Sequence, residues 1–203
     1  MQDVSQNRHR RSIRLKGYDY TQLGVYFVTI CTVQRAEIFG EVVHGEMRLN
    51  PSGDIVREEW LKTAEIRSNV ELHEDEFVIM PNHVHGIVWI VESTSVGATR
   101  GSVESLPVGA TRRVAPTNGS RTLVPGSLGA ILGQFKSITA KRINLLRGTR
   151  GVSVWQRNFY EHIIRNETEL ENIWDYIDTN PLRWQEDKLH PAALPNPFNQ
   201  HIP

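Results

Sequence analysis

Two histidines stand at a spacing that suits metal-assisted phosphate chemistry. His83 and His85 are separated by one residue in the run PNHVHG, residues 81–86. On a β-strand, side chains at i and i+2 point to the same face, so the two imidazoles would project together while Val84 turns into the core. Two adjacent imidazoles can ligate one divalent metal ion. We also expect Gly86 to leave room there for a phosphate backbone to approach, because it has no side chain.

A tyrosine and an asparagine form a second candidate pair near the end of the predicted final helix. Tyr176 and Asn180 are four residues apart, so on a helix they lie on one flank. Against a sheet edge that bears His83 and His85, this helix would supply an attacking oxygen and a third metal ligand. From the residues alone a structural interpretation stays open, with hydrogen-bonded core histidines, a tyrosine at the core margin and an asparagine that ends a helix.

The elements that must position these residues are interspersed strands and helices. Apolar and β-branched runs predict strands at residues 24–32, 76–80 and 83–91, a hairpin at 41–49 and an extended segment at 152–160. Apolar residues at helical spacing predict helices that begin after Asn50 and Pro51, at residue 128 and at Asn166. With a hairpin and few parallel crossovers, this order favours an α+β fold with a mainly antiparallel sheet.

Length and composition allow one sizeable core or at most two small domains, and we expect a single domain over residues 1–203. The chain is 39% hydrophobic and 23% charged, the usual balance of a globular protein. Its one cysteine, Cys31, excludes a disulfide framework. We expect a basic N-terminal arm at residues 1–16 and an exposed, flexible low-complexity insertion at 93–127, which is too poor in large apolar residues to fold. The apolar runs are too short for a membrane helix and the N-terminus is no secretory signal, so we expect a cytoplasmic protein without a membrane partner.

Three segments, taken in order, resemble the REP-associated tyrosine transposases, which are single-tyrosine members of the HUH (His-hydrophobic-His) nuclease superfamily. They are residues 81–86 (PNHVHG), residues 155–158 (WQRN) with 161–165 (EHIIR), and residues 176–181 (YIDTNP). The similarity runs from about Arg14 to about Trp184 and is interrupted by the insertion.

The resemblance implies a ferredoxin-like sheet with helices packed on it. It implies a metal-dependent endonuclease and strand transferase that binds a hairpin of a repeated extragenic palindrome and cleaves the adjoining single-stranded DNA. His83 and His85 correspond to the metal pair, Asn180 to the third ligand and Tyr176 to the nucleophile. The product would be a 5′-phosphotyrosine with a free 3′-hydroxyl, and the cofactor Mg²⁺ or Mn²⁺. Such a protein would be nucleoid-associated, and both a monomer and a homodimer are open.

Basic residues are the expected DNA contacts. The 23 basic and 23 acidic residues balance, yet the basic ones gather in two segments that can form a local anion-binding surface. The candidates are Arg8, Arg10, Arg11, Arg14, Lys16, Lys136, Lys141, Arg142 and Arg157. For each of them a solvated surface position is the alternative.

The sequence leaves three alternatives open, one for the nucleophile and two for the function. Tyr160 is a rival nucleophile, although the residue four positions on is Ile164, which cannot ligate a metal. The protein could instead be a domesticated, catalytically idle binder of palindromic repeat DNA. It could also be a metal-dependent hydrolase of small phosphodiesters with water as the nucleophile, which we rank last because no Asp or Glu is expected beside the histidine pair.

Overall fold

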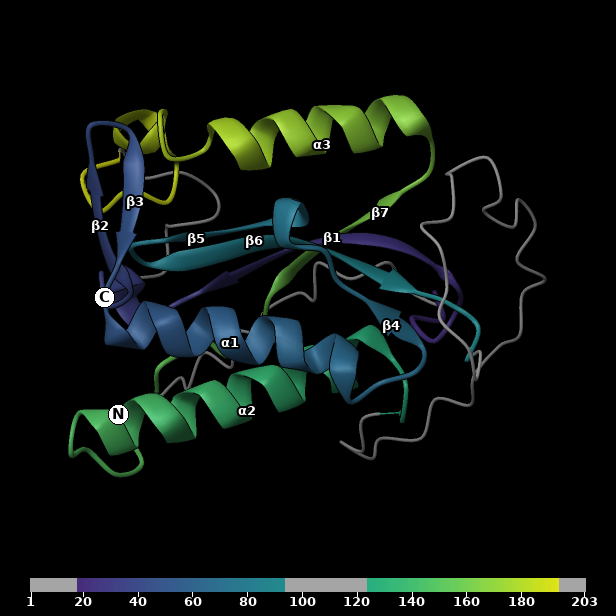
Figure 1. Cartoon of the computed structure of the whole chain (residues 1–203), viewed down its shortest axis with the longest axis horizontal. Helices are drawn as coiled ribbons and strands as arrows, with labels where there is room; N and C mark the ends of the chain where they lie inside the picture. Colours follow the sequence, from purple (N-terminus) through teal and green to yellow (C-terminus); the bar gives the residue numbers. More distant parts are fainter. Residues whose placement is uncertain (1–17, 94–123, 194–203) are drawn as a thin grey trace, which may run out of the picture.

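The computed structural model describes residues 18–93 and 124–193, and an antiparallel sheet forms its middle layer (Figure 1). Its two central strands are β1 (Gly24–Cys31) and β6 (His83–Ile90), which pair over their whole length. Strand β7 (Tyr160–Ile164) pairs with the other side of β1. Strands β4 (Val70–Glu71) and β5 (Phe77–Met80) pair with opposite ends of β6. The sheet order is therefore β4/β5, β6, β1, β7.

Helices cover both faces of this sheet. Helices α1 (Pro51–Glu65) and α2 (Leu128–Leu146) lie side by side on one face, and α3 (Glu167–Thr179) lies on the other (Figure 1). In chain order, β1, α1, β5, β6, α2 and β7 give the β-α-β-β-α-β succession of a ferredoxin-like fold. The predicted α+β class with a mainly antiparallel sheet and packed helices is confirmed. None of the described helices is long and apolar enough to cross a membrane.

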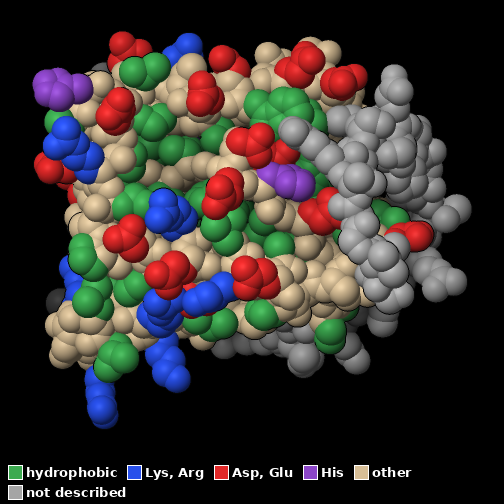
Figure 2. Space-filling view, in the orientation of Figure 1, with side chains coloured by type: hydrophobic (Ala, Val, Ile, Leu, Met, Phe, Trp, Pro, Cys, Tyr) green, Lys and Arg blue, Asp and Glu red, His purple; other side chains and the backbone are tan. Residues whose placement is uncertain are grey.

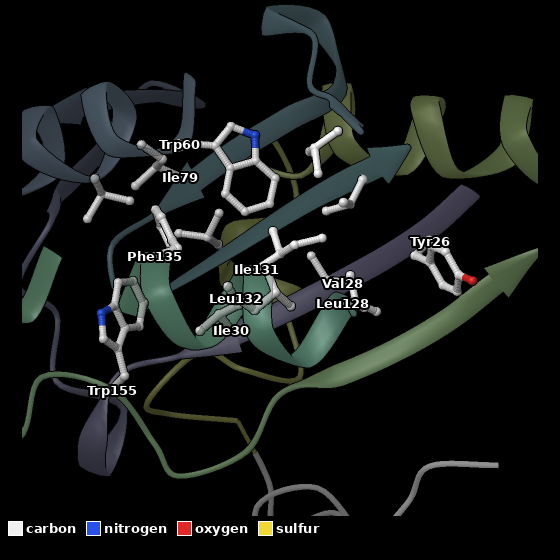
Figure 3. Packing of buried hydrophobic residues seen from close by; sticks show 14 of the residues in the cluster. Tyr26, Val28, Ile30, Trp60, Ile79, Leu128, Ile131, Leu132, Phe135 and Trp155 are labelled. Atoms are coloured by element: carbon white, nitrogen blue, oxygen red, sulfur yellow. The ribbon is translucent and has the colours of Figure 1, made fainter. Parts of the chain in front are cut away.

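Burial on both faces explains why β1 and β6 read as continuous apolar runs. Even-numbered residues of β1, such as Val28 and Ile30, pack under α1 and α2 with Trp60 and Phe135 (Figure 3). Odd-numbered residues face α3 in a second cluster, which includes Phe27. Because a helix layer covers each face, neither face needs the polar residues of a solvated strand.

Side-chain caps fix where the helices begin. The Asn50 side chain accepts hydrogen bonds from the backbone N–H groups of Ser52 and Gly53, at 2.9 and 3.2 Å. The Asn166 side chain accepts from the N–H of Glu169 at 2.9 Å and so starts α3 at the predicted residue. Each cap satisfies N–H groups that the helix itself leaves without partners. The register of α3, and with it the position of Tyr176, follows from this cap.

Two segments of the chain complete the described structure. The predicted hairpin forms a separate two-stranded sheet of β2 (Gly40–Val43) and β3 (Glu46–Leu49), turning at His44 and Gly45, which both have positive φ. Among the described residues, the segment at 152–160 pairs only through an isolated bridge between Trp155 and Thr32, and the strand of this region, β7, begins only at its last residue. Three carbonyls of the segment are bound by the ammonium group of Lys136 instead of by a neighbouring strand.

The predicted N-terminal arm, residues 1–16, lies outside the described residues, and so does most of the predicted insertion at 93–127. Of the expected DNA contacts, the five in the arm, Arg8, Arg10, Arg11, Arg14 and Lys16, therefore have no described position.

Candidate active site

The two histidines lie at the start of β6 and face α3. His83 and His85 are 0% and 2% exposed, and their ring centroids are 4.5 Å apart. Val84 between them points to the opposite face and joins the core under α1 and α2, as the alternation predicts. The histidine pair is therefore held on a central strand beneath a helix.

A hydrogen bond to the preceding asparagine fixes the ring of His83. The Asn82 amide nitrogen donates to the backbone carbonyls of Arg35 and Leu189, at 3.2 and 2.9 Å, so its oxygen faces His83 Nδ1 at 2.7 Å. That oxygen needs a donor, so Nδ1 carries the proton and the lone pair lies on Nε2. Burial above all, and then the charges of His85 and Arg35, lower the pKa of His83 well below its usual value. His83 Nε2 is buried without a hydrogen-bond partner among the described residues, as a metal ligand would be.

His85 is held between a threonine and the tyrosine of α3. Its Nδ1 lies 2.8 Å from Thr29 Oγ1, and its Nε2 lies 3.0 Å from the hydroxyl of Tyr176. Burial lowers the pKa of His85 to about 3, so the ring is neutral at pH 7. The tautomer in which Nδ1–H donates to Thr29 Oγ1 is the one that leaves the lone pair of Nε2 facing Tyr176, as metal binding through Nε2 requires.

Helix α3 carries Tyr176 and Asn180 to this place. Tyr176 is 38% exposed, whereas Asn180 is 3% exposed, and its amide oxygen has no hydrogen-bond partner among the described residues. Burial, and after it the charge of Asp187, raises the pKa of Tyr176 to about 12. The four residues predicted to share a site thus lie together, with the tyrosine at the solvent side.

Buried Glu76 ties α3 to the sheet close to Tyr176. One carboxylate oxygen of Glu76 accepts the indole N–H of Trp89 on β6 at 2.6 Å. The other accepts the indole N–H of Trp174 on α3 at 3.2 Å. Because Trp174 stands two residues before Tyr176, this bridge restricts movement of the part of α3 that carries the tyrosine.

An aspartate that the sequence reasoning missed completes the group. Asp187 Oδ2 lies 3.9 Å from His83 Nε2 and 3.4 Å from the amide nitrogen of Asn180. One ligand atom from each of His83, His85 and Asp187 fits within 4.8 Å. Burial raises the pKa of Asp187. The expectation that no acid stands beside the histidines is wrong, because the chain folds back after α3 through the 3₁₀ helix Trp184–Glu186. No spacing rule in the sequence marks this residue.

The expected role of Gly86 is also wrong. Gly86 follows His85 on β6, so its Cβ position lies on the same face as Val84, toward α1 and α2 and away from the histidines. A Cβ at this position would lie 2.4 Å from Cζ2 of Trp60 and 3.2 Å from the Cβ of Phe77. Glycine is needed there because the Trp60 indole occupies the space, and a phosphate has no access.

A cavity of about 550 Å³ opens beside the histidines. It extends from His85, Tyr176, Asn180 and Asp187 across β1 to the beginning of β7. Its other walls come from the segment before β7 and from the chain after α3: Gln156, Asn158, Phe159, Tyr160, Arg183, Glu186, Lys188 and Leu189. The site is therefore an open pocket with aromatic, amide and charged groups around the tyrosine.

The remaining predicted site residues fall into two groups, one at or next to the cavity and one on α2. Tyr160, the rival nucleophile, lines the far wall of the cavity, and Arg157 is exposed in the adjoining segment. Arg142 lies between α2 and α1, where it makes ion pairs with Glu58 and Glu59 at 2.7 and 2.5 Å. In Figure 2, acidic side chains are spread over the upper and middle part of the face, and several basic ones lie in its lower part, toward α2.

Lys136 and Lys141 are the other two predicted DNA contacts on α2. Lys136 donates to the backbone carbonyls of Gln156, Arg157 and Asn158, at 2.5, 3.3 and 3.2 Å. Lys141 is exposed on the same helix. Helix α2 lies across the sheet from Tyr176, so the structure does not bring Lys141 or Arg142 to the cavity (Figure 1).

Comparison of sequences identifies a relative of this chain. An uncharacterized protein of Haemophilus influenzae (strain Rd) is 37% identical over 182 residues, which span 90% of this chain and 93% of that protein. The two chains belong to one family. No family model matches the sequence. Because that relative is uncharacterized, membership of this family shows no activity.

Two solved structures are similar to this chain. A REP-associated tyrosine transposase, solved bound to a REP hairpin, is 18% identical with a TM-score of 0.49, over 86% of this chain and 73% of that one. A Deinococcus radiodurans R1 protein, provisionally named a transposase, is 16% identical with a TM-score of 0.40, over 81% of this chain and 96% of that one.

Proposed function

We propose that the protein is a metal-dependent endonuclease and strand transferase for single-stranded DNA, with Tyr176 as its nucleophile. The observation that carries this proposal is the 3.0 Å contact between the Tyr176 hydroxyl and His85 Nε2. A phenol beside two buried, neutral imidazoles is arranged for attack at a phosphate that a cation holds.

His83, His85 and Asp187 would hold the divalent cation, with Asn180 as a neighbouring oxygen donor. The fit is supported by two buried lone-pair donors without hydrogen-bond partners among the described residues, His83 Nε2 and Asn180 Oδ1. Imidazole and oxygen donors suit Mn²⁺ at least as well as Mg²⁺. When bound, the cation would neutralise charge on the scissile phosphate and polarise it.

The reaction would be a transesterification. The Tyr176 oxygen attacks the phosphorus, the bond from phosphorus to the 3′-oxygen breaks, and the phenol proton ends on that 3′-oxygen. The products are a 5′-phosphotyrosine and a free 3′-hydroxyl, so the energy of the phosphodiester is kept for rejoining. With its pKa raised to about 12, Tyr176 is protonated at pH 7, so proton loss must accompany attack.

The proposed substrate is the single strand beside a hairpin of a repeated extragenic palindrome. This step depends on the three sequence segments that resemble the REP-associated tyrosine transposases. The arm arginines Arg8, Arg10, Arg11 and Arg14 with Lys16, and Arg157 near the cavity, are proposed phosphate contacts.

The test is formation and mapping of a covalent adduct. The protein is incubated with hairpin-flanked single-stranded DNA and Mn²⁺ or Mg²⁺, and denaturing electrophoresis separates any DNA-linked protein. We expect an adduct that mass spectrometry maps to Tyr176, that Tyr176→Phe abolishes, and that the control Tyr160→Phe retains. An adduct on Tyr160, or one that survives Tyr176→Phe, would contradict the assignment.

A second candidate is a phosphodiester hydrolase that uses water. The buried carboxylate of Asp187 beside His83 favours it, because such a carboxylate could serve a water nucleophile. It predicts turnover of a small phosphodiester without an adduct, ¹⁸O uptake from labelled water and little effect of Tyr176→Phe. Normal hairpin binding with no cleavage under Mg²⁺, Mn²⁺ or Co²⁺ would instead favour the idle DNA binder.

A further inference from the structure

We propose that the far end of the active-site cavity is a subsite for one nucleobase of the single-stranded substrate, with Tyr160 as its stacking surface. The inference rests on the proposed function, because the base belongs to the nucleotide next to the phosphate that Tyr176 attacks. It gives a role to Tyr160 and to the segment at 156–158, which the proposed chemistry leaves without one.

Tyr160 lies in the same lateral row of the sheet as His85. Thr29 on β1 pairs with His85 on one side and with Tyr160 on the other. Directly paired residues point to the same face of a sheet, and the Thr29 hydroxyl contacts the His85 ring on the face that α3 covers. Tyr160 therefore projects on the active-site face. Two strand spacings of about 4.8 Å place its backbone about 10 Å from that of His85, beside the metal-binding group and not within it.

Aromatic rings from β1 and β7 line this cavity. The ring of Phe27 stacks on His85 at 5.4 Å and meets Tyr176 edge-on at 6.0 Å, which holds it as a wall of the cavity. Tyr160 is 39% exposed and faces the same cavity. The volume of about 550 Å³ falls in the range of pockets that enclose small ligands. Stacking on aromatic side chains is the usual way in which proteins hold bases of single strands.

Amide groups stand where the edge of a stacked base would lie. Gln156 and Asn158 are exposed and line the cavity next to Tyr160. Amides offer both a donor and an acceptor, as the edges of bases do. The Lys136 ammonium binds the backbone carbonyls at 156, 157 and 158, so it fixes the backbone that presents both amides. Lys136 is thus a positioning residue for this segment and not a phosphate contact.

Cations on the cavity wall fit the phosphates of such a nucleotide. Arg183 and Lys188 line the pocket on the side of the chain that follows α3, together with the acidic residues Glu186 and Asp187. A strand that lies across β1 would place its phosphates near these cations and its base on the aromatic side. A base of single-stranded DNA is therefore the occupant that the rings and amides of the cavity favour.

The test uses a fluorescent base in a protein that cannot cleave. Tyr176→Phe is titrated with hairpin-flanked single-stranded DNA that carries 2-aminopurine at one position at a time along the single strand. We expect strong quenching at one position. Adding Tyr160→Ala should remove this quenching and weaken binding about 5- to 100-fold, whereas adding Tyr160→Phe should preserve both.

Lys136→Met tests the positioning role. In the cleavage-competent chain we expect it to reduce discrimination among the four bases at that position by about tenfold, as Gln156→Ala should. The matched control is Lys62→Met on α1, which removes an exposed lysine on the far side of the sheet.

Two outcomes would overturn the subsite: quenching and affinity that survive Tyr160→Ala, or abasic substrates cleaved with unchanged kcat/KM at every flanking position. Stacking on Tyr160 without any covalent adduct would instead contradict the proposed function and leave the subsite standing. A covalent adduct on Tyr176, with base stacking and affinity that do not depend on Tyr160, would support the proposed function and contradict the subsite.

Discussion

The hydroxyl of Tyr176 lies 3.0 Å from Nε2 of His85, so the proposed nucleophile and a proposed metal ligand share one hydrogen bond. Nε2 of a neutral imidazole with a protonated Nδ1 has a single lone pair. This lone pair can accept the phenol proton or bind a cation, but it cannot do both. Cation binding at His85 must therefore release the Tyr176 hydroxyl, which couples metal loading to exposure of the nucleophile.

This competition predicts that Tyr176→Phe binds the metal more tightly. Removing the hydroxyl removes the hydrogen bond that the cation has to break, which is about 0.5–1.5 kcal/mol, so Mn²⁺ affinity should rise about 2- to 12-fold. Calorimetric titration with Mn²⁺ measures it, with Tyr160→Phe as the control of unchanged affinity. A weaker affinity would mean that the Tyr176 oxygen is itself a ligand.

Loss of the Asp187 carboxylate should weaken the metal site. In Asp187→Asn the charged oxygen 3.9 Å from His83 Nε2 becomes a neutral amide, so we expect Mn²⁺ affinity to fall at least about tenfold. The same change should lower the pKa of Tyr176, because the charge of Asp187 contributes to raising it. Asp178→Asn, an exposed position on α3, removes an equal charge away from the site. Equal metal affinity in both variants would exclude Asp187 as a ligand.

The buried histidines should make the metal-free protein sensitive to acid. Burial lowers the pKa of His85 to about 3 and that of His83 well below 6.5, while in the unfolded chain both stay near 6.5. The neutral imidazoles therefore contribute fully to the free energy of unfolding above about pH 6.5. This contribution is lost as the pH falls toward the pKa values of the folded chain. His85 alone should cost about 1 kcal/mol of unfolding free energy between pH 7.5 and 5.5, and the lowered pKa of His83 adds to this loss.

Urea unfolding in the presence of a chelator measures this effect at the two pH values. His85→Gln should show a smaller loss between them than the wild-type chain, whatever its stability at pH 7.5. A free energy of unfolding that is the same at both pH values would show that the imidazoles are accessible to protons in solution.

Gly86→Ala should destabilise the fold and leave the histidines on their face. The new Cβ would meet Trp60 Cζ2 at 2.4 Å, an overpacking that typically costs about 1–3 kcal/mol. Chemical denaturation measures the change, and Gly24→Ala on β1 is the control, since its Cβ would make ordinary contacts from 3.4 Å outward. Combining Gly86→Ala with Trp60→Phe should recover part of the loss, and a loss that is simply additive would contradict the steric explanation.

Local patterns carried most of the fold prediction. The apolar runs located β1 and β6, the Asn50 and Asn166 caps located the starts of α1 and α3, and the His44-Gly45 pair located the hairpin. These features depend on backbone geometry and hydrogen bonds within a few residues. The extended segment expected at 152–160 forms only an isolated bridge, because Lys136 from another element binds three of its carbonyls.

The sequence by itself determined the strand that aligns His83 with His85 and the helix that aligns Tyr176 with Asn180, because both alignments follow from a periodicity of two to four residues. Only the tertiary structure decided that these pairs meet, that Asp187 joins them and that Gly86 turns away to admit Trp60. It also placed Tyr160 one strand beyond Thr29, beside the site. Such contacts arise from packing between segments far apart in the chain, and the spacing of residues within one segment does not determine which side chains of other segments they will contact.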